Sequence, residues 1–234
     1  MSNSVQSLNN IVEFELNKLV LLLSGILASS GAWAERFSTQ VFNHQGQPQD
    51  NIVVYLAPTS GIDGLPINDQ SLVIDQKGKK FAPYLSVMQK GQPIKFSNQD
   101  DITHHIYSVS GENRFEFKLK AGNTKTTEPM HSTEEIAMGC NVHDWMSGYT
   151  LVVDTPYFGK TDDKGVVSFD LAKLGEYRIT AWHPQLDNDE HEQSQLIVID
   201  ANMLDNVHQI KLVNELMPIP LQESEEEFDF LEEY

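Results

Sequence analysis

Cysteine is nearly absent from this sequence of 234 residues, which contains only Cys140. One sulfur excludes an intramolecular disulfide, a cysteine-rich zinc site, a thiolate-held iron–sulfur cluster and a two-cysteine haem attachment, since each needs more than one thiol. Basic residues are also scarce, with 16 Lys and Arg against 34 Asp and Glu and a formal net charge of −18. Phosphate polyanions are bound mainly by clustered Lys and Arg, so we expect no nucleic-acid or anionic-membrane partner.

Long hydrophobic runs are missing as well. The apolar stretch 19–27 follows Lys18 and is too short to span a bilayer as a helix. Small residues and the A-x-A pattern 32–34 come after it, which predicts that residues 1–34 are a signal peptide and that the mature chain starts at Glu35 with a charge of −17. An uncleaved apolar anchor is the alternative. We therefore expect a secreted, periplasmic protein that contacts the membrane only transiently, through its signal peptide.

Segments with the 3.6-residue period of a long helix are absent beyond residue 35. The sequence instead alternates short β-branched and aromatic runs with glycine-containing turns, which predicts an all-β sandwich or barrel. The predicted strands are 37–42, 52–56, 71–74, 94–96, 105–109, 115–119, 149–153, 166–169, 177–182, 195–199 and 208–213. The stretch 222–234 is dominated by acids and is expected to be a disordered, solvated tail.

The chemistry-bearing residues gather in two segments. Cys140, His143 and Met146 follow one another at three-residue intervals, and His104 and His105 lie about 35 residues upstream at a predicted strand start. A thiolate, two imidazoles and a weak axial thioether form the blue-copper ligand set. A free thiol in an oxidising compartment also needs an explanation, and ligation provides one.

Three other interpretations of these residues remain open. Zinc accepts Cys and His, but a structural zinc site wants a fourth strong ligand where this loop offers only Met146. A Cys140–His143 nucleophilic pair would need an orienting third group. The third interpretation is a buried cysteine with incidental neighbours. A further histidine-containing stretch, 183–192, spreads its donors widely and is expected to be an acidic exposed loop rather than a metal site.

The Cys-x-x-His-x-x-Met pattern, with Asn98 six residues before His104, resembles the copper-binding pattern of the cupredoxins, most closely the amicyanin and plastocyanin group. The wider sequence is similar to secreted bacterial proteins described as methylamine utilisation or cupredoxin-like proteins. The resemblance implies one type 1 copper ion with His104, Cys140 and His143 as equatorial ligands and Met146 as the axial one. It also implies that Asn98 forms hydrogen bonds near the thiolate and braces the two ligand segments.

His105 competes with His104 as the ligand. The offset from Asn98 favours His104, and strand alternation would place His105 on the opposite face. The sequence departs from the family pattern around the cysteine, because Met138 and Gly139 stand before it and the ligand loop contains no proline. We expect Trp145, beside His143, either to pack in the core or to form an apolar patch at the metal edge.

Two domains are expected from resemblance. Residues 35–75 and 155–221 resemble the opening and closing strands of a carboxypeptidase regulatory-like, transthyretin-type β-sandwich. A Greek-key cupredoxin β-sandwich at 76–154 would then be inserted into this discontinuous domain. The simpler alternative is a copper domain at 35–154 followed by a small sandwich.

Together these features predict a one-electron carrier rather than an enzyme, with a redox protein as its partner and no small-molecule substrate. Because the chain is acidic, a basic partner is expected. The alternatives are copper storage or delivery, and a binding or adhesion sandwich in which the metal is structural.

Overall fold

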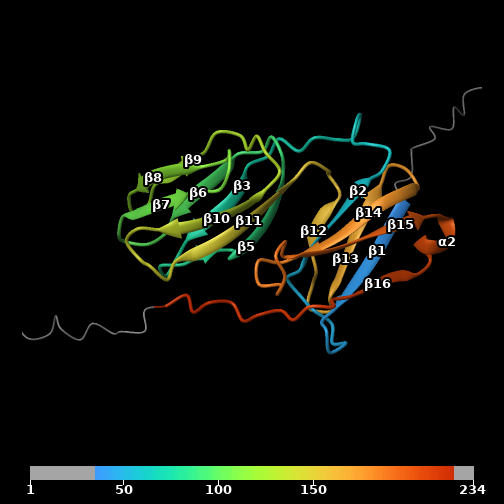
Figure 1. Ribbon diagram of the computed structural model, residues 1–234. Coiled ribbons are helices and arrows are strands. Elements are labelled where there is room, and N and C mark those ends of the chain that lie inside the picture. The colour runs from blue at the N-terminus through green and yellow to red at the C-terminus, as the bar shows by residue number, and fades with distance from the viewer. Residues whose placement is uncertain (1–34, 224–234) are drawn as a thin grey trace, which may run out of the picture. The chain divides into compact units, whose positions relative to one another are not determined.

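The computed structural model describes residues 35–223, and this part of the chain is nearly all β-structure (Figure 1). Within that range the one helix is α2 (Ala201–Leu204), a single turn whose capping residue Asp200 accepts a hydrogen bond from the Met203 amide. No helix in the described range is long and apolar enough to cross a membrane. The expected all-β class is confirmed. The expected signal peptide, 1–34, and residues 224–234 of the expected acidic tail lie outside the described residues.

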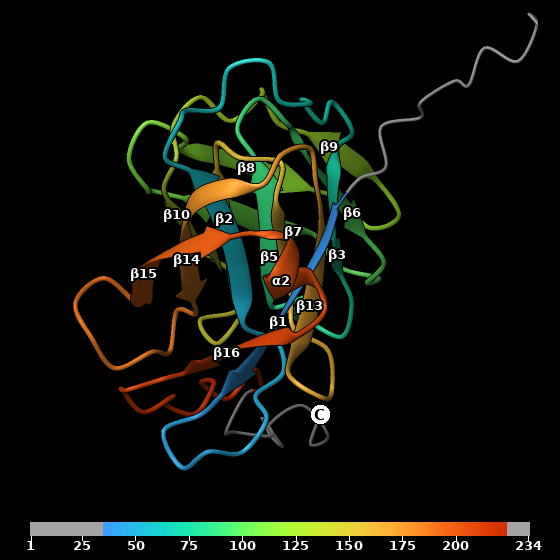
Figure 2. The ribbon, with the colours of Figure 1, turned by 90° about the vertical axis from the view of Figure 1, so that its right-hand side faces the viewer.

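Strands from the two ends of the described chain form one sandwich, which we call the terminal sandwich (Figure 2). Its strands are β1 (Glu35–Phe42), β2 (Val53–Pro58), β12 (Phe158–Lys160), β13 (Val166–Leu171), β14 (Gly175–Trp182), β15 (Glu192–Ile199) and β16 (Val207–Lys211). They pair in the orders β13–β1–β16 and β12–β2–β14–β15. Phe37 and Val41 point to the same face of β1, because side chains alternate along a strand, and both pack with Leu56 and Ile179 in one buried core.

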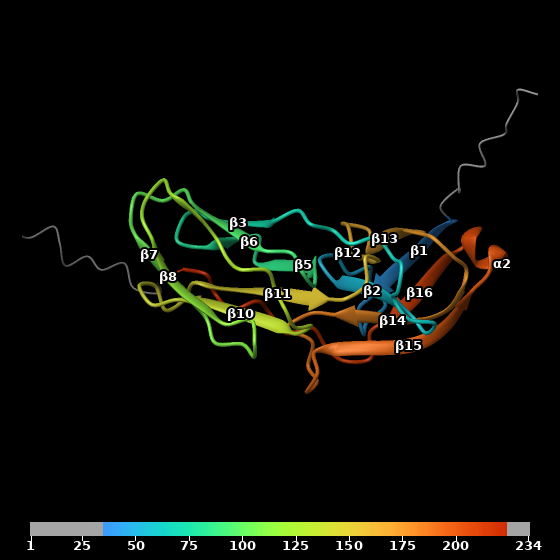
Figure 3. The same cartoon turned by 90° about the horizontal axis from the view of Figure 1, so that it is seen from above.

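The middle of the chain forms a second, central sandwich. Its strands are β3 (Leu72–Gln76), β4 (Phe81–Ala82), β5 (Leu85–Gln89), β6 (Ile94–Asn98), β7 (His104–Ser108), β8 (Phe115–Leu119), β9 (Thr124–Thr126), β10 (Glu135–Cys140) and β11 (Ser147–Val153). One sheet has the order β4–β3–β6–β9 and the other β5–β11–β10–β7–β8. In Figure 3, β3 and β6 lie in one layer and β10 and β11 in the other. Phe96, Ile106 and Ile136 are fully buried between the layers.

The strand order along the chain places β3 to β11 between β2 and β12. The predicted boundary between residues 75 and 76 falls inside β3, which pairs with β6 from Leu72 onward. The last residues of the predicted segment 35–75 therefore lie in the central sandwich. Val53 and Trp182 of the terminal sandwich share a third apolar cluster with Leu85 and Val153 of the central one.

The stretch 183–192 between β14 and β15 differs from the exposed loop expected from its acidic sequence. His183 is 2% exposed, and Leu186 is buried in the core of the terminal sandwich. A hydrogen bond from the amide of His183 to the carbonyl of His191 joins the first part of this stretch to its last part. Only the later, acidic part of the loop faces solvent.

Candidate metal centre

Three side chains named from the sequence come together at one end of the central sandwich. His104 is the first residue of β7, Cys140 is the last residue of β10, and His143 lies in the loop that leads to β11. Their exposed fractions are 0%, 3% and 7%. The Cys140 Sγ atom lies 3.6 Å from Nδ1 of His104 and 3.8 Å from Nδ1 of His143. The three donor atoms form a buried group that could hold a metal ion, with all of them within 4.8 Å of one another.

Strand pairing explains why these residues meet. β10 pairs antiparallel with β7, and Cys140 is opposite Ile106. Because alternate residues share a face, Cys140 points into the same interior as His104 and Ile106. The loop after β10 then turns back at once, and the amide of Met146 donates to the carbonyl of His143 at 3.0 Å. A strand pair and one tight loop thus fix all three donors.

Asp100 fixes the orientation of the His104 ring. Its Oδ2 atom lies 2.8 Å from Nε2 of His104, so that nitrogen carries the proton and Nδ1 presents its lone pair to the cluster. The same carboxylate accepts hydrogen bonds from the amides of Gly78 at 2.6 Å and Lys79 at 2.9 Å. Burial alone would raise the pKa of Asp100, but the hydrogen bonds from Lys79, His104 and Gly78 outweigh it and lower the pKa. Asp100 therefore stays ionised beside the ring.

His143 is the outer member of the group. Its ring centroid lies 5.1 Å from that of His104 and 5.2 Å from that of Trp145. Burial lowers the pKa of His143, and the neighbouring His104 and the Lys79 ammonium lower it further, while the Asp100 carboxylate opposes them. A neutral imidazole at pH 7 is the form that binds a metal.

The donor spacing fits a single transition-metal ion. With metal–nitrogen bonds of about 2.0 Å and metal–sulfur bonds of about 2.3 Å, a nitrogen and a sulfur bound to one ion at an angle of about 110–120° are about 3.5–3.7 Å apart. The two observed nitrogen–sulfur distances, 3.6 and 3.8 Å, lie within about 0.1 Å of this range. Soft thiolate together with imidazole suits copper or zinc rather than magnesium or calcium.

Met146 and Asn98 lie close to this group in different ways. Met146 is 1% exposed and belongs to the same apolar cluster as Cys140. Asn98 is buried, and its Nδ2 atom donates to the carbonyls of Ile102 and Leu119. Its Oδ1 atom accepts from the amide of Asp100. Asn98 therefore braces the turn that carries Asp100 and His104. The expected hydrogen bond near the thiolate stays a prediction.

His105, the alternative ligand, points away from the group. Its Nε2 atom lies 2.8 Å from Oε1 of Glu116, and its Nδ1 atom lies 3.3 Å from Nδ2 of Asn141. Strand alternation causes this outcome, since neighbouring residues of β7 face opposite sides of the sheet. His104, and not His105, is the histidine of this strand within the group.

Two contacts of the strands that carry the group, one of Asp100 and one of Tyr107, were not identified from the sequence. Asp100 stands four residues before His104. An acid at that distance, on a turn, is a sequence signal for a carboxylate that bonds the histidine ring. Tyr107 gave no local signal. Its ring lies over Gly139, where an added Cβ would be 2.7 Å from ring atoms. The glycine before Cys140 therefore makes room for an aromatic ring supplied by another strand.

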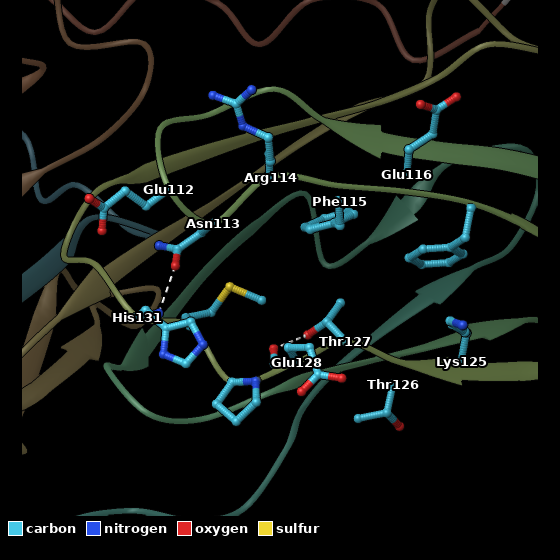
Figure 4. Close-up of a pocket in the computed structure, with 13 residues that line it drawn as sticks. Glu112, Asn113, Arg114, Phe115, Glu116, Lys125, Thr126, Thr127, Glu128 and His131 are labelled. Carbon is cyan, nitrogen blue, oxygen red and sulfur yellow. Dashed lines mark hydrogen bonds between the residues drawn. The ribbon is translucent and has the colours of Figure 1, made fainter.

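A groove of about 300 Å³ lies elsewhere on the central sandwich, between β8 and the segment after β9 (Figure 4). Phe115 and Phe117 line it, and the Nζ atom of Lys125 lies 5.8 Å from the Phe117 ring centroid. The buried side chain of Asn113 donates a hydrogen bond to the carbonyl of Ser132 and accepts hydrogen bonds from the amides of His131 and Ser132. The groove shares no residue with the metal-binding group.

Comparisons with known proteins found similarity only among solved structures: no family model matches the chain, and no curated protein does. A copper-containing nitrite reductase from Thermus scotoductus SA-01 is 20% identical over 36% of this chain and 22% of its own length, with a TM-score of 0.33. A methionine-to-alanine mutant of amicyanin in the Cu(I) form is 16% identical over 36% of this chain and 82% of its own, with a TM-score of 0.33.

A purple cupredoxin from Nitrosopumilus maritimus is 18% identical over 36% of this chain and 100% of its own, with a TM-score of 0.32. This chain spans less than a quarter of the nitrite reductase. The assignment of a metal-binding group rests on its own geometry, in which a buried thiolate and two oriented imidazoles surround one position in an all-β fold.

Proposed function

We propose that this protein binds one copper ion in a type 1 site and acts as a one-electron carrier. The observation that carries the proposal is the convergence of Cys140, His104 and His143 in a buried group with the donor spacing of a single ion. His104, Cys140 and His143 would be the equatorial ligands and Met146 the axial one. When bound, copper supplies a one-electron couple between Cu(II) and Cu(I).

The chain contributes orientation and rigidity. Asp100 and its two backbone donors hold the His104 ring in one tautomer. The amide of Asn141 donates to the carbonyl of His105, which ties the start of the ligand loop to β7. A ligand set held by paired strands rearranges little between two oxidation states. His143 has the largest exposed fraction of the three, which makes its edge the place for outer-sphere electron exchange.

The test of copper ligation is spectroscopic. We expect Cu(II) reconstitution of the full chain to produce an intense visible band from the thiolate–copper bond, and Cys140→Ser to abolish it. His105→Ala is the matched control and should keep the band, since this histidine faces Glu116. Absence of the band in the unchanged chain, or its survival in Cys140→Ser, would rule out the type 1 site.

Voltammetry then separates a carrier from a copper store. A reversible couple with fast self-exchange is expected for a carrier, whereas a slow or irreversible couple would indicate storage or delivery. Metal analysis of protein purified without added metal addresses a structural zinc site, in which bound zinc rather than copper would be found, because affinity alone favours Cu(II) over Zn(II) at most such sites.

Export and partner choice belong to the same proposal. The sequence of residues 1–34 supports export to the periplasm, and cell fractionation tests it. The partner would be a redox protein, and the net acidity of the chain supports a basic one. Co-purification from the periplasm would identify it. Under this proposal the protein has no substrate pocket and is not itself an enzyme.

A further inference from the structure

The last described residues of the chain run back from the terminal sandwich to the ligand loop. The segment 212–223 leaves β16 and passes along the central sandwich (red in Figure 1). It is attached on the way to the loop after β14, since the amide of Met217 donates to the carbonyl of Gln185 at 2.8 Å. The end of the segment reaches Ser147, which directly follows Met146 in the sequence and is the first residue of β11.

Ser147 lies where its sheet has lost a neighbouring strand. On one side β11 pairs with β10, and Ser147 is opposite Gly139. On the other side β11 pairs with β5, but only from Tyr149 onward, and the Tyr149 amide donates to the carbonyl of Tyr84 at 2.7 Å. Backbone donors alternate in direction along a strand, so the amide of Ser147 points to the same side as that of Tyr149. Among the described strands none pairs with Ser147 on this side.

The side chain of Gln222 takes the place of the missing strand. Its Oε1 atom accepts a hydrogen bond from the amide of Ser147 at 3.3 Å, and its Nε2 atom donates to the Ser147 hydroxyl at 3.0 Å. The same Nε2 atom donates to the carbonyl of Pro220 at 3.1 Å, which fixes the side chain against its own segment. A glutamine amide has one oxygen and two N–H donors. Both donors and the oxygen of Gln222 are therefore engaged.

Met146 stands at the end of the ligand loop that Gln222 holds. The opposite end is fixed by β7, because the amide of Asn141 donates to a carbonyl of that strand. Met146 is 1% exposed and belongs to the apolar cluster that contains Cys140, although Ser147 beside it is half-buried. The backbone of Ser147 thus sets where the Met146 side chain enters this cluster, and the contact with Gln222 fixes that backbone on its open side.

We propose that Gln222 is a positioning residue of the ligand loop, which by holding Ser147 keeps the Met146 side chain in the apolar cluster with Cys140. This hold on Met146 does not depend on the proposed function. Its consequence for the metal does rest on that function, under which Met146 is the axial ligand. The axial ligand tunes the reduction potential of a type 1 site. Gln222 therefore influences the potential without belonging to the ligand set.

Oxidation by hydrogen peroxide tests the hold in the copper-free full chain. Peroxide converts an accessible thioether to the sulfoxide, and peptide mass spectrometry measures the rate at each methionine. In Gln222→Ala we expect Met146 to oxidise several-fold faster than in the unchanged chain. Met138 is the internal reference, because it is 3% exposed in the same apolar cluster but lies on β10. Oxidation of the Cys140 thiol is scored separately in the same peptides.

Gln193→Ala is the matched control. Gln193 forms the same kind of contact at the other end of the segment, where its side chain accepts from the amide of Val213 at 2.8 Å and donates to the carbonyl of Lys211 at 2.9 Å. Because this contact lies in the terminal sandwich, its loss should leave the Met146 rate unchanged. An equal rise at Met146 in both variants, or a rise at Met138 as large as that at Met146, would overturn the proposal, since either would show general loosening of the fold.

Copper-loaded protein tests the consequence. Gln222→Ala should keep the thiolate–copper band, shift the reduction potential and release copper to a chelator several-fold faster, whereas Gln193→Ala should match the unchanged chain in all three. An unchanged Met146 oxidation rate in Gln222→Ala would overturn the hold itself. Faster oxidation of Met146 with an unchanged potential would overturn the consequence at the metal. If the unchanged chain gave no band, the proposed function would fail, and the peroxide result would still decide the hold.

Discussion

At the scale of single residues, the metal-binding group depends on groups that are not ligands. The Asp100 carboxylate accepts hydrogen bonds from two backbone amides of the β3–β4 turn and from the His104 ring, so it joins that turn to the buried imidazole. A carboxylate behind a ligating histidine fixes its tautomer and raises its basicity.

Asp100→Asn should therefore weaken copper binding by roughly 10–100-fold, because an amide cannot accept the same charge-assisted hydrogen bond. Competition titration against a chelator of known affinity measures the effect. Asp101→Asn is the matched control, since Asp101 is exposed and next to it in the chain. Equal weakening in both variants would mean that Asp100 acts only through general charge.

Gly139 is a second residue whose role follows from a close contact. A Cβ at this position would lie 2.7 Å from the Tyr107 ring, and the residue is part of a regular strand. Gly139→Ala should destabilise the protein by about 1–3 kcal/mol through overpacking, as measured by urea unfolding. In a Tyr107→Leu background the same substitution should cost less. An equal cost in both backgrounds would contradict this explanation.

At the scale of elements, the β10–β11 pair decides where the thiolate lies. β10 was not among the strands predicted from the sequence, since EIAMGC contains few β-branched or aromatic residues. Its strand conformation comes from pairing on both sides, with β7 and β11. β5 and the short β4, β9 and β12 were missed in the same way, because tertiary pairing overrides weak local preference.

The end of β14 gives a prediction about pH. His183 is buried there, and its Nδ1 atom accepts a hydrogen bond from the amide of Gln185. Burial lowers the pKa of His183 to about 4, and the positive charges of His191 and Lys160 add to the effect. Between about pH 6.5 and pH 4 the unfolded chain thus binds a proton that the folded chain does not.

Above pH 6.5 the titration of His183 therefore takes nothing from the free energy of unfolding. As the pH drops from 6.5 toward 4, this one group should lower the free energy of unfolding by at most about 1.4 kcal/mol per pH unit. His183→Gln should remove that part of the slope in urea unfolding measured at several pH values. His143 and His208 also have lowered pKa values, but they affect the pH dependence of the unchanged chain and of the His183→Gln variant equally. Their effect therefore cancels when the two slopes are compared. Identical slopes would show that His183 titrates normally in the folded chain.

At the scale of the whole molecule, the uneven charge is the main feature. The central sandwich is nearly neutral, and most of the excess acid lies in the flanking segments and in residues 224–234. Self-repulsion of a net charge of −18 opposes the compact state.

Salt should therefore raise the thermal stability of the full chain. Between about 10 and 200 mM NaCl we expect Tm to increase by a few degrees, because the Debye length shortens and like charges repel less. Differential scanning calorimetry measures this at pH 7. A decrease in Tm would mean that ion pairs such as Lys80–Glu223 outweigh the repulsion.

The sequence by itself determined the all-β class and the residue types of the candidate site. The β-branched and aromatic runs between glycine turns are local signals, and they predicted the β-structure. Strand alternation is also local, and it predicted the opposite orientation of His104 and His105. The spacing of Cys140, His143 and Met146 is likewise local, and this spacing alone is enough to single out the ligand loop.

Only the tertiary structure decided which groups support that site. Asp100 and the Gly78 amide reach the group through loop closure between distant segments, and no local pattern encodes such contacts. Tyr107 meets Gly139 through the pairing of β7 with β10, on the face opposite to the group. The same reason explains Asn98, whose bonds to Ile102 and Leu119 depend on how β6, β7 and β8 meet. Local periodicity specifies which side chains face inward, but the partners they find there are set by packing across the sandwich.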